Sequence, residues 1–167
     1  MSRVTLVLGG ARSGKSRFAE GLARELSGPK TYVATAEAFD EEMRQRIAKH
    51  REDRAGDGWQ TVEAPLDPAT VISGAEGLVL MDCVTVWLGN LMHHGKDIRA
   101  AVGNLCDALA ATHAQVILVS NEVGLSIVPE NAMARRFRDE QGFANQRLAL
   151  VAEAAYFVAA GLPLRLK

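Results

Sequence analysis

Short apolar runs alternate with longer stretches of helical periodicity along this chain. The apolar runs predict strands over residues 4–8, 31–35, 59–63, 78–81, 115–120, 155–160 and 164–166, the last two joined across 161–163. Apolar residues at helical spacing predict helices over 16–26, 40–54, 84–92 and 98–112, and a long helical region after 129–131 that is broken near Gly142. This alternation favours an α/β fold with a parallel sheet and crossover helices.

Length and composition narrow the class of protein. With 167 residues and about 150 residues per domain, we expect one domain over residues 1–167. A net charge of -1 argues against a protein that coats nucleic acid, so no nucleic-acid partner is expected. No apolar run approaches the ~18 residues of a membrane span, and the start of the chain lacks the apolar stretch of a secretion signal. Cys83 and Cys106 alone exclude a disulfide scaffold and fit a reducing cytoplasm.

The most specific local motif is a glycine-rich loop between the first strand and the first helix. Its sequence is GGARSGKS, which fits the phosphate-binding pattern G-x-x-x-x-G-K-[ST] in the required strand–loop–helix context. Glycines let the backbone amides close around phosphate oxygens, and the helix N-terminus adds a favourable dipole. Lys15 would reach the β- and γ-phosphates, and the Ser16 hydroxyl would ligate Mg²⁺. The loop predicts a nucleoside triphosphate site more firmly than it predicts a reaction.

Polar residues follow two of the buried strands. Asp82 comes directly after the strand over 78–81, where a Walker B carboxylate would support Mg²⁺, although a helix cap or a loop acid would give the same pattern. Asn121 and Glu122 follow the strand over 115–120. Because ligands of open parallel sheets bind beyond the carboxyl ends of the strands, both side chains are candidates to face a substrate. Turn chemistry alone would also explain Asn121.

One histidine sits on a basic helix. His50 shares a helix face with Met43 and Ile47, at the edge of the stripe that faces inward. Neighbouring cations disfavour the imidazolium and leave a neutral ring nitrogen, which can attack phosphorus. The cations around it are Lys49, Arg51 and Arg54. Spacing alone favours an ordinary, partly exposed helix histidine over a nucleophile.

The longer sequence segments resemble those of one family. The segments GGARSGKS, YVATAEAFDEEMRQRIAKHREDR, WQTVEAP, MDCVTVWLGN, VSNEVGLSIVPENAMARRFRDEQGFANQRLA and GLPLRLK occur in this order. Together they resemble the bifunctional adenosylcobinamide kinase/adenosylcobinamide-phosphate guanylyltransferase family of cobalamin biosynthesis. The resemblance implies a RecA-like P-loop domain, with a mostly parallel central sheet flanked by helices, and a homotrimer. Some relatives carry adjacent histidines where this chain has Lys49 and His50.

The resemblance also implies the chemistry. ATP or GTP would phosphorylate adenosylcobinamide, and GTP would then give GMP to adenosylcobinamide phosphate through a GMP–His50 intermediate, with Mg²⁺ as the metal. Lys15 would be the second catalytic residue, and Ser16 and Asp82 would hold the metal. The implied nucleotide-binding residues are Gly9, Gly10, Ala11, Arg12, Ser13, Gly14, Lys15, Ser16, Ala34, Thr35, Ala36, Arg51, Glu52, Asp53, Arg54, Glu63 and Asp82.

Two other functions fit the phosphate loop. One is a P-loop small-molecule kinase without guanylyl transfer, and the other is a binding protein operated by a nucleotide. Cys83 and Thr85, in the segment DCVT, are interpreted as packing residues. Three arginines near the start of the last helical region are candidates for phosphate contact, within one chain or across a subunit boundary: Arg135, Arg136 and Arg138. Their spacing fits charged side chains on a solvated helix face equally well.

Overall fold

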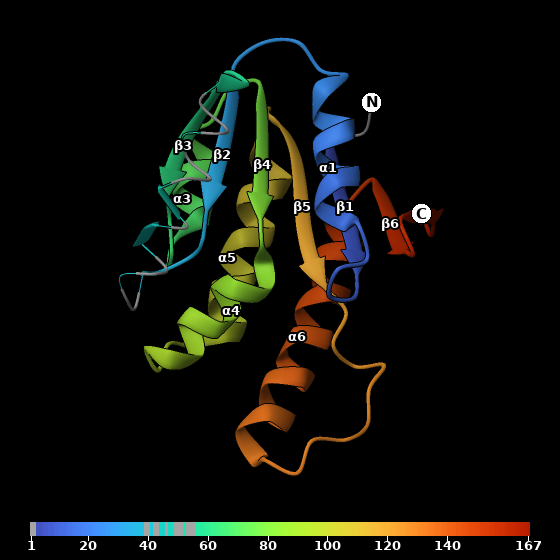
Figure 1. Cartoon of the computed structure of the whole chain (residues 1–167). Coiled ribbons are helices and arrows are strands. Elements are labelled where there is room, and N and C mark those ends of the chain that lie inside the picture. The colour runs from blue at the N-terminus through green and yellow to red at the C-terminus, as the bar shows by residue number, and fades with distance from the viewer. Residues whose placement is uncertain (1–2, 39–40, 42–43, 46, 49–51, 53–55) are drawn as a thin grey trace.

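A twisted sheet forms the centre of the computed structural model, which describes residues 3–38, 41, 44–45, 47–48, 52 and 56–167 (Figure 1). Within these residues seven strands pair in the order β3-β2-β4-β5-β1-β6-β7. The strands are β1 (Val4–Gly9), β2 (Lys30–Ala34), β3 (Trp59–Glu63), β4 (Leu78–Asp82), β5 (Gln115–Asn121), β6 (Ala154–Ala159) and β7 (Leu162–Arg165). All neighbours are parallel except β7, which runs antiparallel to β6. The predicted mostly parallel sheet is confirmed.

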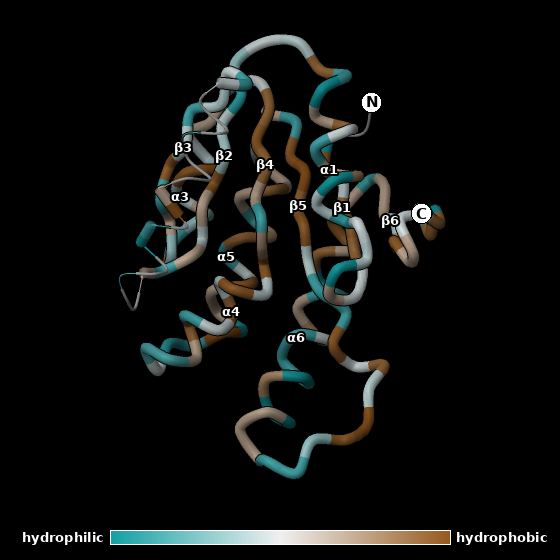
Figure 2. Tube along the Cα trace, viewed as in Figure 1, coloured by the Kyte–Doolittle hydropathy of each residue, from teal (hydrophilic) through white to brown (hydrophobic). Residues whose placement is uncertain are grey.

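Helices cover both faces of this sheet. Helix α1 (Lys15–Arg24) lies on one face, and Ala19 and Ala23 pack there against Leu80 and Val119. The opposite face carries α3 (Pro68–Ser73), α4 (Val84–His93), α5 (Ile98–Ala111) and α6 (Ala132–Val151). Because both faces are covered, the central strands are apolar throughout, and Figure 2 shows β4 and β5 in brown along most of their length.

Two sequence predictions differ from the structure. Helix α6 runs without a break through Gly142, because its buried residues Ala144 and Leu148 gain more than the ~1 kcal/mol that a helical glycine costs. The turn between β6 and β7 consists of Ala160 and Gly161 alone, both with positive φ (52° and 79°). Leu162 and Pro163 therefore belong to β7, whose position at the sheet edge tolerates a proline.

Helix α3 was not predicted, although its local signals are present. The Asp67 carboxylate accepts a hydrogen bond from the Thr70 amide, and Pro68 occupies the first helical position. Because the helix is only six residues long, its sequence shows too little helical periodicity to predict a helix. Among the described residues, no helix is long and apolar enough to cross a membrane. His50, Arg51, Asp53 and Arg54 lie outside the described residues.

Candidate active site

The phosphate loop connects Gly9 at the end of β1 to Lys15 at the start of α1. Its glycines are needed for space and for backbone conformation. A Cβ at Gly9 would lie 2.6 Å from the carbonyl oxygen of Val158, and Gly14 has a φ of 96°. An L-side chain at either position would push the loop out of its turn, so the loop geometry depends on both glycines.

The start of α1 offers unpaired amides to an anion. Gly14 is the N-cap residue and supplies no side-chain cap, so the first-turn amides of this ten-residue helix receive no side-chain acceptor. The Nζ atom of Lys15 donates to the Gly10 carbonyl oxygen at 3.3 Å, which folds the ammonium group back over the loop. Ser16 follows in the first helical turn and is partly exposed. This arrangement suits the phosphate groups of a nucleotide.

The β6–β7 turn supports the loop from the other side. The Gly161 amide donates to the Ser13 carbonyl oxygen at 2.7 Å. A Cβ at Gly14 would stand 3.0 Å from the Gly161 Cα, so the two backbones are nearly in van der Waals contact. Ala11 and Arg12 remain exposed at the tip of the loop, where Arg12 adopts a left-handed φ of 57°.

Strand register lines up three of the predicted site residues. Ala34 is paired with Glu63 on β3 and with Asp82 on β4, so the three residues form a row at the carboxyl ends of neighbouring strands. Directly after the row, the buried Thr35 hydroxyl donates to the Cys83 carbonyl oxygen at 2.9 Å and accepts from the Cys83 amide at 3.1 Å. Thr35 therefore fixes the end of β2 against the end of β4 through its side chain.

A buried side-chain amide also holds the segment at Thr35. Asn90 on α4 donates from Nδ2 to the Thr35 carbonyl oxygen at 2.7 Å and to the Pro65 carbonyl oxygen at 3.0 Å. The segments that follow β2 and β3 are thus held by one side chain. Ala36, the next predicted nucleotide-site residue, is exposed.

Cys83 follows Asp82 directly after the end of β4 and is half-buried. Burial raises the pKa of the Cys83 thiol, the Asp82 carboxylate raises it further, and the Lys15 ammonium lowers it. A raised pKa keeps the thiol protonated and weakly nucleophilic. Its Sγ accepts from the Val86 amide at 3.4 Å and caps α4, which supports the predicted packing role.

A cavity of about 690 Å³ opens beside the row of strand ends. It brings together three predicted nucleotide-site residues, Ala36, Glu52 and Glu63. Arg44, Ile47 and Ala48 also border it, and so does Glu37, whose carboxylate oxygen lies 3.1 Å from His94 Nε2. The space is wide enough for a nucleoside.

A second cavity, of about 430 Å³, lies beside the phosphate loop. It is lined by Gly10, Ala11, Asn121, Glu122, Val123, Leu125, Ser126 and Phe157. The Glu122 amide donates to the Gly9 carbonyl oxygen at 3.0 Å, so the segment after β5 is attached directly to the phosphate loop. This agrees with the prediction that residues after β5 face the ligand side of the sheet.

A buried polar network fixes the end of β5, and the sequence analysis missed it. Ser120 donates to Asn145 Oδ1 at 2.7 Å, and Gln141 donates to Ser120 Oγ at 2.9 Å. Asn145 in turn donates to the Asn121 carbonyl oxygen at 3.1 Å. The available signal was two amide side chains, four residues apart, on the same helix face as Ala144 and Leu148. Thr85 adds a further bond, because its Oγ1 accepts from the Asn121 amide at 2.8 Å.

The arginines at the start of α6 serve the helix itself in this structure. Arg135 donates to the carbonyl oxygens of Pro129 and Glu130, and Arg138 pairs with Asp139 at 2.9 Å. Arg136 is exposed. These contacts agree with solvated helix charges at Arg135 and Arg138.

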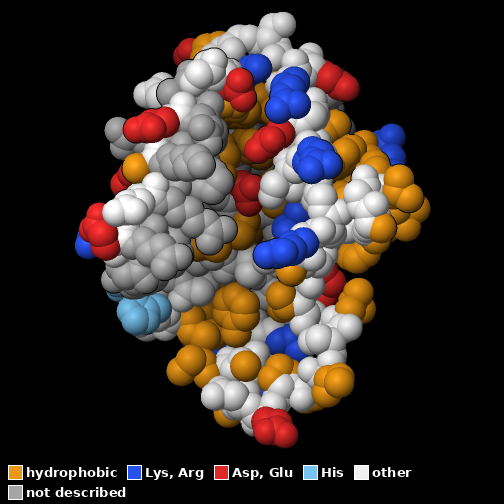
Figure 3. Space-filling model, in the orientation of Figure 1, with side chains coloured by type: hydrophobic (Ala, Val, Ile, Leu, Met, Phe, Trp, Pro, Cys, Tyr) orange, Lys and Arg blue, Asp and Glu red, His pale blue; other side chains and the backbone are white. Residues whose placement is uncertain are grey.

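The space-filling view shows the site as an open hollow. In Figure 3 acidic and basic side chains surround a depression in the middle of the visible face. Hydrophobic side chains gather below it, in the region where Figure 1 draws α4, α6 and the long loop between β5 and α6. That loop carries exposed apolar residues, with Leu125 and Ile127 83% and 94% exposed.

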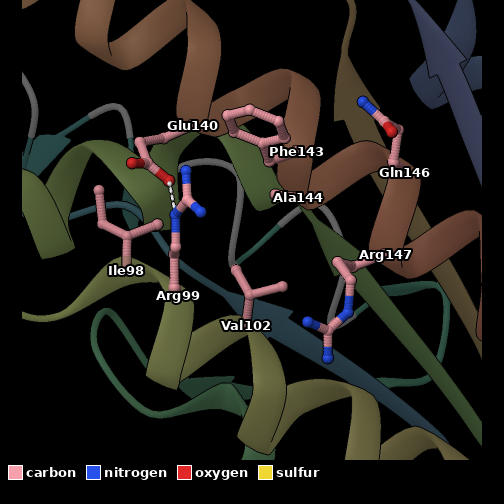
Figure 4. A pocket seen from close by; sticks show the side chains of 8 residues that line it. All are labelled: Ile98, Arg99, Val102, Glu140, Phe143, Ala144, Gln146 and Arg147. Atoms are coloured by element: carbon pink, nitrogen blue, oxygen red, sulfur yellow. Dashed lines mark hydrogen bonds and ion pairs between the residues drawn. The ribbon is translucent and has the colours of Figure 1, made fainter.

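A separate, smaller pocket of about 160 Å³ lies between α5 and α6 (Figure 4). Arg99 pairs there with Glu140 at 3.4 Å, and its guanidinium carbon lies 4.7 Å from the centroid of the Phe143 ring. The pocket shares no residue with the two cavities described above. Most of the Arg99 side chain is exposed, so its ion pair contributes little to stability.

Sequence comparisons find relatives along nearly the whole chain. The family model for cobinamide kinase / cobinamide phosphate guanyltransferase matches residues 5–166. The bifunctional adenosylcobalamin biosynthesis protein CobP of Pseudomonas aeruginosa is 45% identical, over 97% of this chain and 96% of that protein. The CobU protein of the same description from Escherichia coli is 38% identical, over 97% of this chain and 98% of that protein.

Solved structures share the fold at low sequence identity. A KaiC-like protein from Pyrococcus horikoshii superposes with a TM-score of 0.53 at 16% identity, over 93% of this chain and 71% of that chain. An ATPase of a bacterial type III secretion system gives a TM-score of 0.51 at 10% identity, over 98% of this chain and 56% of that chain. The predicted RecA-like P-loop fold is confirmed.

Proposed function

This chain belongs to the cobinamide kinase / cobinamide phosphate guanyltransferase family and is an enzyme of cobalamin biosynthesis, and from this premise we propose that it carries out two successive transfers. In the first, ATP or GTP phosphorylates the aminopropanol hydroxyl of adenosylcobinamide. In the second, GTP donates GMP to the resulting phosphate. The observation that carries the proposal is a phosphate loop at the same edge of the sheet as two cavities, one beside Glu63 and one beside Glu122.

The kinase step uses the phosphate loop directly. The substrate hydroxyl oxygen attacks the γ-phosphorus, the bond from that phosphorus to the bridging oxygen breaks, and the nucleoside diphosphate leaves. The ammonium group of Lys15, held over the loop by the Gly10 carbonyl, neutralises charge on the β- and γ-phosphates. The α1 amides hold the same oxygens in a fixed orientation.

The guanylyl step uses the same loop with the attack moved to the α-phosphorus. A ring nitrogen of His50 attacks this phosphorus, and pyrophosphate leaves toward Lys15. A phosphate oxygen of adenosylcobinamide phosphate then displaces the imidazole and gives adenosylcobinamide-GDP. His50 lies outside the described residues, but its sequence neighbours Ala48 and Glu52 border the same cavity as Glu63, which supports attack from this side.

A divalent metal fits the oxygen donors of the site. The described residues contain no cluster of three or more His, Cys, Asp or Glu side chains. Mg²⁺ is typically held by one or two protein oxygens together with substrate phosphates, so a dense cluster is not required. Ser16 and Asp82 would hold it, and when bound it neutralises charge on the transferred phosphate groups.

We further propose that the chain acts as one catalytic domain over residues 1–167, in the cytoplasm and as a homotrimer. Support for self-association comes from large apolar side chains that are exposed in the single chain. On β7 and just beyond it, Leu162, Leu164 and Leu166 are all more than half exposed. Apolar side chains in such a row at a sheet edge are typical of surfaces that another chain covers.

One assay tests both transfers together. The protein is incubated with GTP, Mg²⁺ and adenosylcobinamide, and the products are analysed by mass spectrometry. We expect adenosylcobinamide phosphate to form first and adenosylcobinamide-GDP with pyrophosphate to follow. Phosphate transfer alone would support a simple kinase, and GTP hydrolysis without any modified cobinamide would contradict both proposed reactions.

Asp82→Asn tests the metal proposal. The amide keeps the size of the side chain but loses its charge, so the Mg²⁺ concentration needed for half-maximal turnover should rise in both reactions. EDTA should abolish turnover of the unchanged protein. The control is Asp97→Asn, because Asp97 caps α5 outside the site and its amide oxygen still accepts from Ala100. Equal Mg²⁺ dependence of the Asp82→Asn protein and the unchanged protein would remove Asp82 from the metal site.

A further inference from the structure

We propose that Glu122 is the catalytic base of the kinase step, taking the proton from the substrate hydroxyl in the cavity between the phosphate loop and the segment after β5. This inference rests on the proposed function, since it assigns a proton acceptor to the first of the two transfers. It also divides the site: the alcohol arm enters beside Glu122, while the nucleoside occupies the cavity beside Glu63.

The position of Glu122 is fixed relative to the phosphate loop. Its amide donates to the Gly9 carbonyl oxygen at 3.0 Å, and its residue lines the same cavity as Gly10 and Ala11. The preceding residue, Asn121, is held by Thr85 and by Asn145. Hydrogen bonds on both sides therefore hold the backbone of Glu122 close to the place where the γ-phosphate would lie.

The carboxylate is held by a contact that needs a glycine. One oxygen of Glu122 accepts from the Gly124 amide. A Cβ at Gly124 would lie only 2.8 Å from that Oε1 atom, so any side chain there would displace the carboxylate. This gives a physical reason for the glycine in the segment NEVG, residues 121–124. Within the part of the chain that the structure describes, the second carboxylate oxygen has no such backbone donor, and it is available to a substrate hydroxyl.

The cavity suits an alcohol arm rather than a whole corrinoid. Its volume of about 430 Å³ has room for an aminopropanol group and a phosphoryl group, whereas the macrocycle must stay outside. Among the described residues that line it, Glu122 is the only titratable one. Leu125 and Phe157 add apolar side chains to the lining of this cavity.

The two reactions differ in their need for this base. In the kinase step the acceptor is an alcohol, so a proton must leave as the oxygen–phosphorus bond forms, and it passes to Glu122 and then to solvent. In the guanylyl step the acceptor is a phosphate that is already anionic, and no proton has to be removed. A carboxylate in this cavity should therefore serve only the first transfer.

Glu122→Gln isolates this role. The glutamine oxygen can still accept from the Gly124 amide, which keeps the loop contact, but the side chain cannot take a proton. We expect kcat of the kinase step to fall about 10²-fold or more with little change in KM for adenosylcobinamide. Guanylyl transfer to adenosylcobinamide phosphate that is supplied directly, and labelling of the protein by α-labelled GTP, should persist.

Two further variants complete the test. Glu130→Gln changes an exposed carboxylate on the same loop and should leave both reactions unaltered. Glu122→Ala removes the loop contact as well and should lower kinase activity at least as far as the glutamine variant does. Kinase turnover of Glu122→Gln at the rate of the unchanged protein would overturn the proposal. So would an equal loss of kinase, guanylyl transfer and protein labelling, because that pattern indicates a structural role. Absence of both transfers in the unchanged protein would instead contradict the proposed function itself.

Discussion

Lys15→Ala should impair phosphoryl transfer and guanylyl transfer together, each by about 10²–10³-fold in kcat. The ammonium group is folded over the phosphate loop by its 3.3 Å bond to the Gly10 carbonyl oxygen. From there it can neutralise the β- and γ-phosphates in the kinase step and the departing pyrophosphate in the guanylyl step. No other lysine lies in the loop, so alanine leaves this charge uncompensated.

The measurement is the rate of each transfer at saturating GTP and Mg²⁺, with folding checked by circular dichroism. Lys30→Ala is the matched control, since Lys30 starts β2 at the opposite end of the sheet and its ammonium group lies 5.9 Å from the centroid of the Trp59 ring. It should leave both rates unchanged. If the folded Lys15→Ala protein retains either transfer at its original rate, the two reactions do not share one triphosphate site.

The sequence predicted the sheet well because each strand has a strong local signal. Residues 78–81 and 115–120 are apolar on both faces, and in the structure they are the two strands, β4 and β5, that are buried between helices on both sides. The phosphate loop was also predictable, because its glycines must meet local geometric demands at Gly9 and Gly14. In both cases the information lies within a few consecutive residues.

The predicted break in the last helix failed because of interactions between distant segments. The break near Gly142 is absent because α6 is held by Gln141 and Asn145, whose partners on β5 are 21 to 25 residues away in the chain. Local propensity favours a break, and tertiary packing overrides it. The role of Thr35 was equally hidden, since its hydroxyl bonds to Cys83 only when β2 and β4 become neighbours.

Part of the candidate site could be predicted from motifs and part could not. The alignment of Glu63, Ala34 and Asp82 in one row depends on strand order, which the sequence does not specify. The cavity beside Glu122 depends on the crossing of the β5–α6 segment over the phosphate loop. Residues after β5 were expected to face a substrate, but a specific chemical role for Glu122 required the cavity and its lining.

His50→Ala should separate the two reactions. It removes the proposed nucleophile and leaves the phosphate loop intact, so GMP should no longer become attached to the protein and guanylyl transfer should stop. Kinase activity should remain measurable, because direct phosphoryl transfer to a hydroxyl needs no histidine adduct. His50→Asn should behave in the same way, since its amide reaches a similar distance and forms no adduct.

Each variant is incubated with α-labelled GTP, and labelled protein is detected on a gel beside a cobinamide phosphorylation assay. The label on the unchanged protein should be lost in acid, as expected of a phosphorus–nitrogen bond, and should be GMP rather than phosphate. His113→Ala is the control, because His113 is exposed beyond the end of α5 and should not affect labelling. Undiminished labelling of His50→Ala would assign the nucleophile to another residue. Loss of both transfers in a folded His50→Ala protein would instead assign His50 to substrate binding, because both transfers require bound substrates.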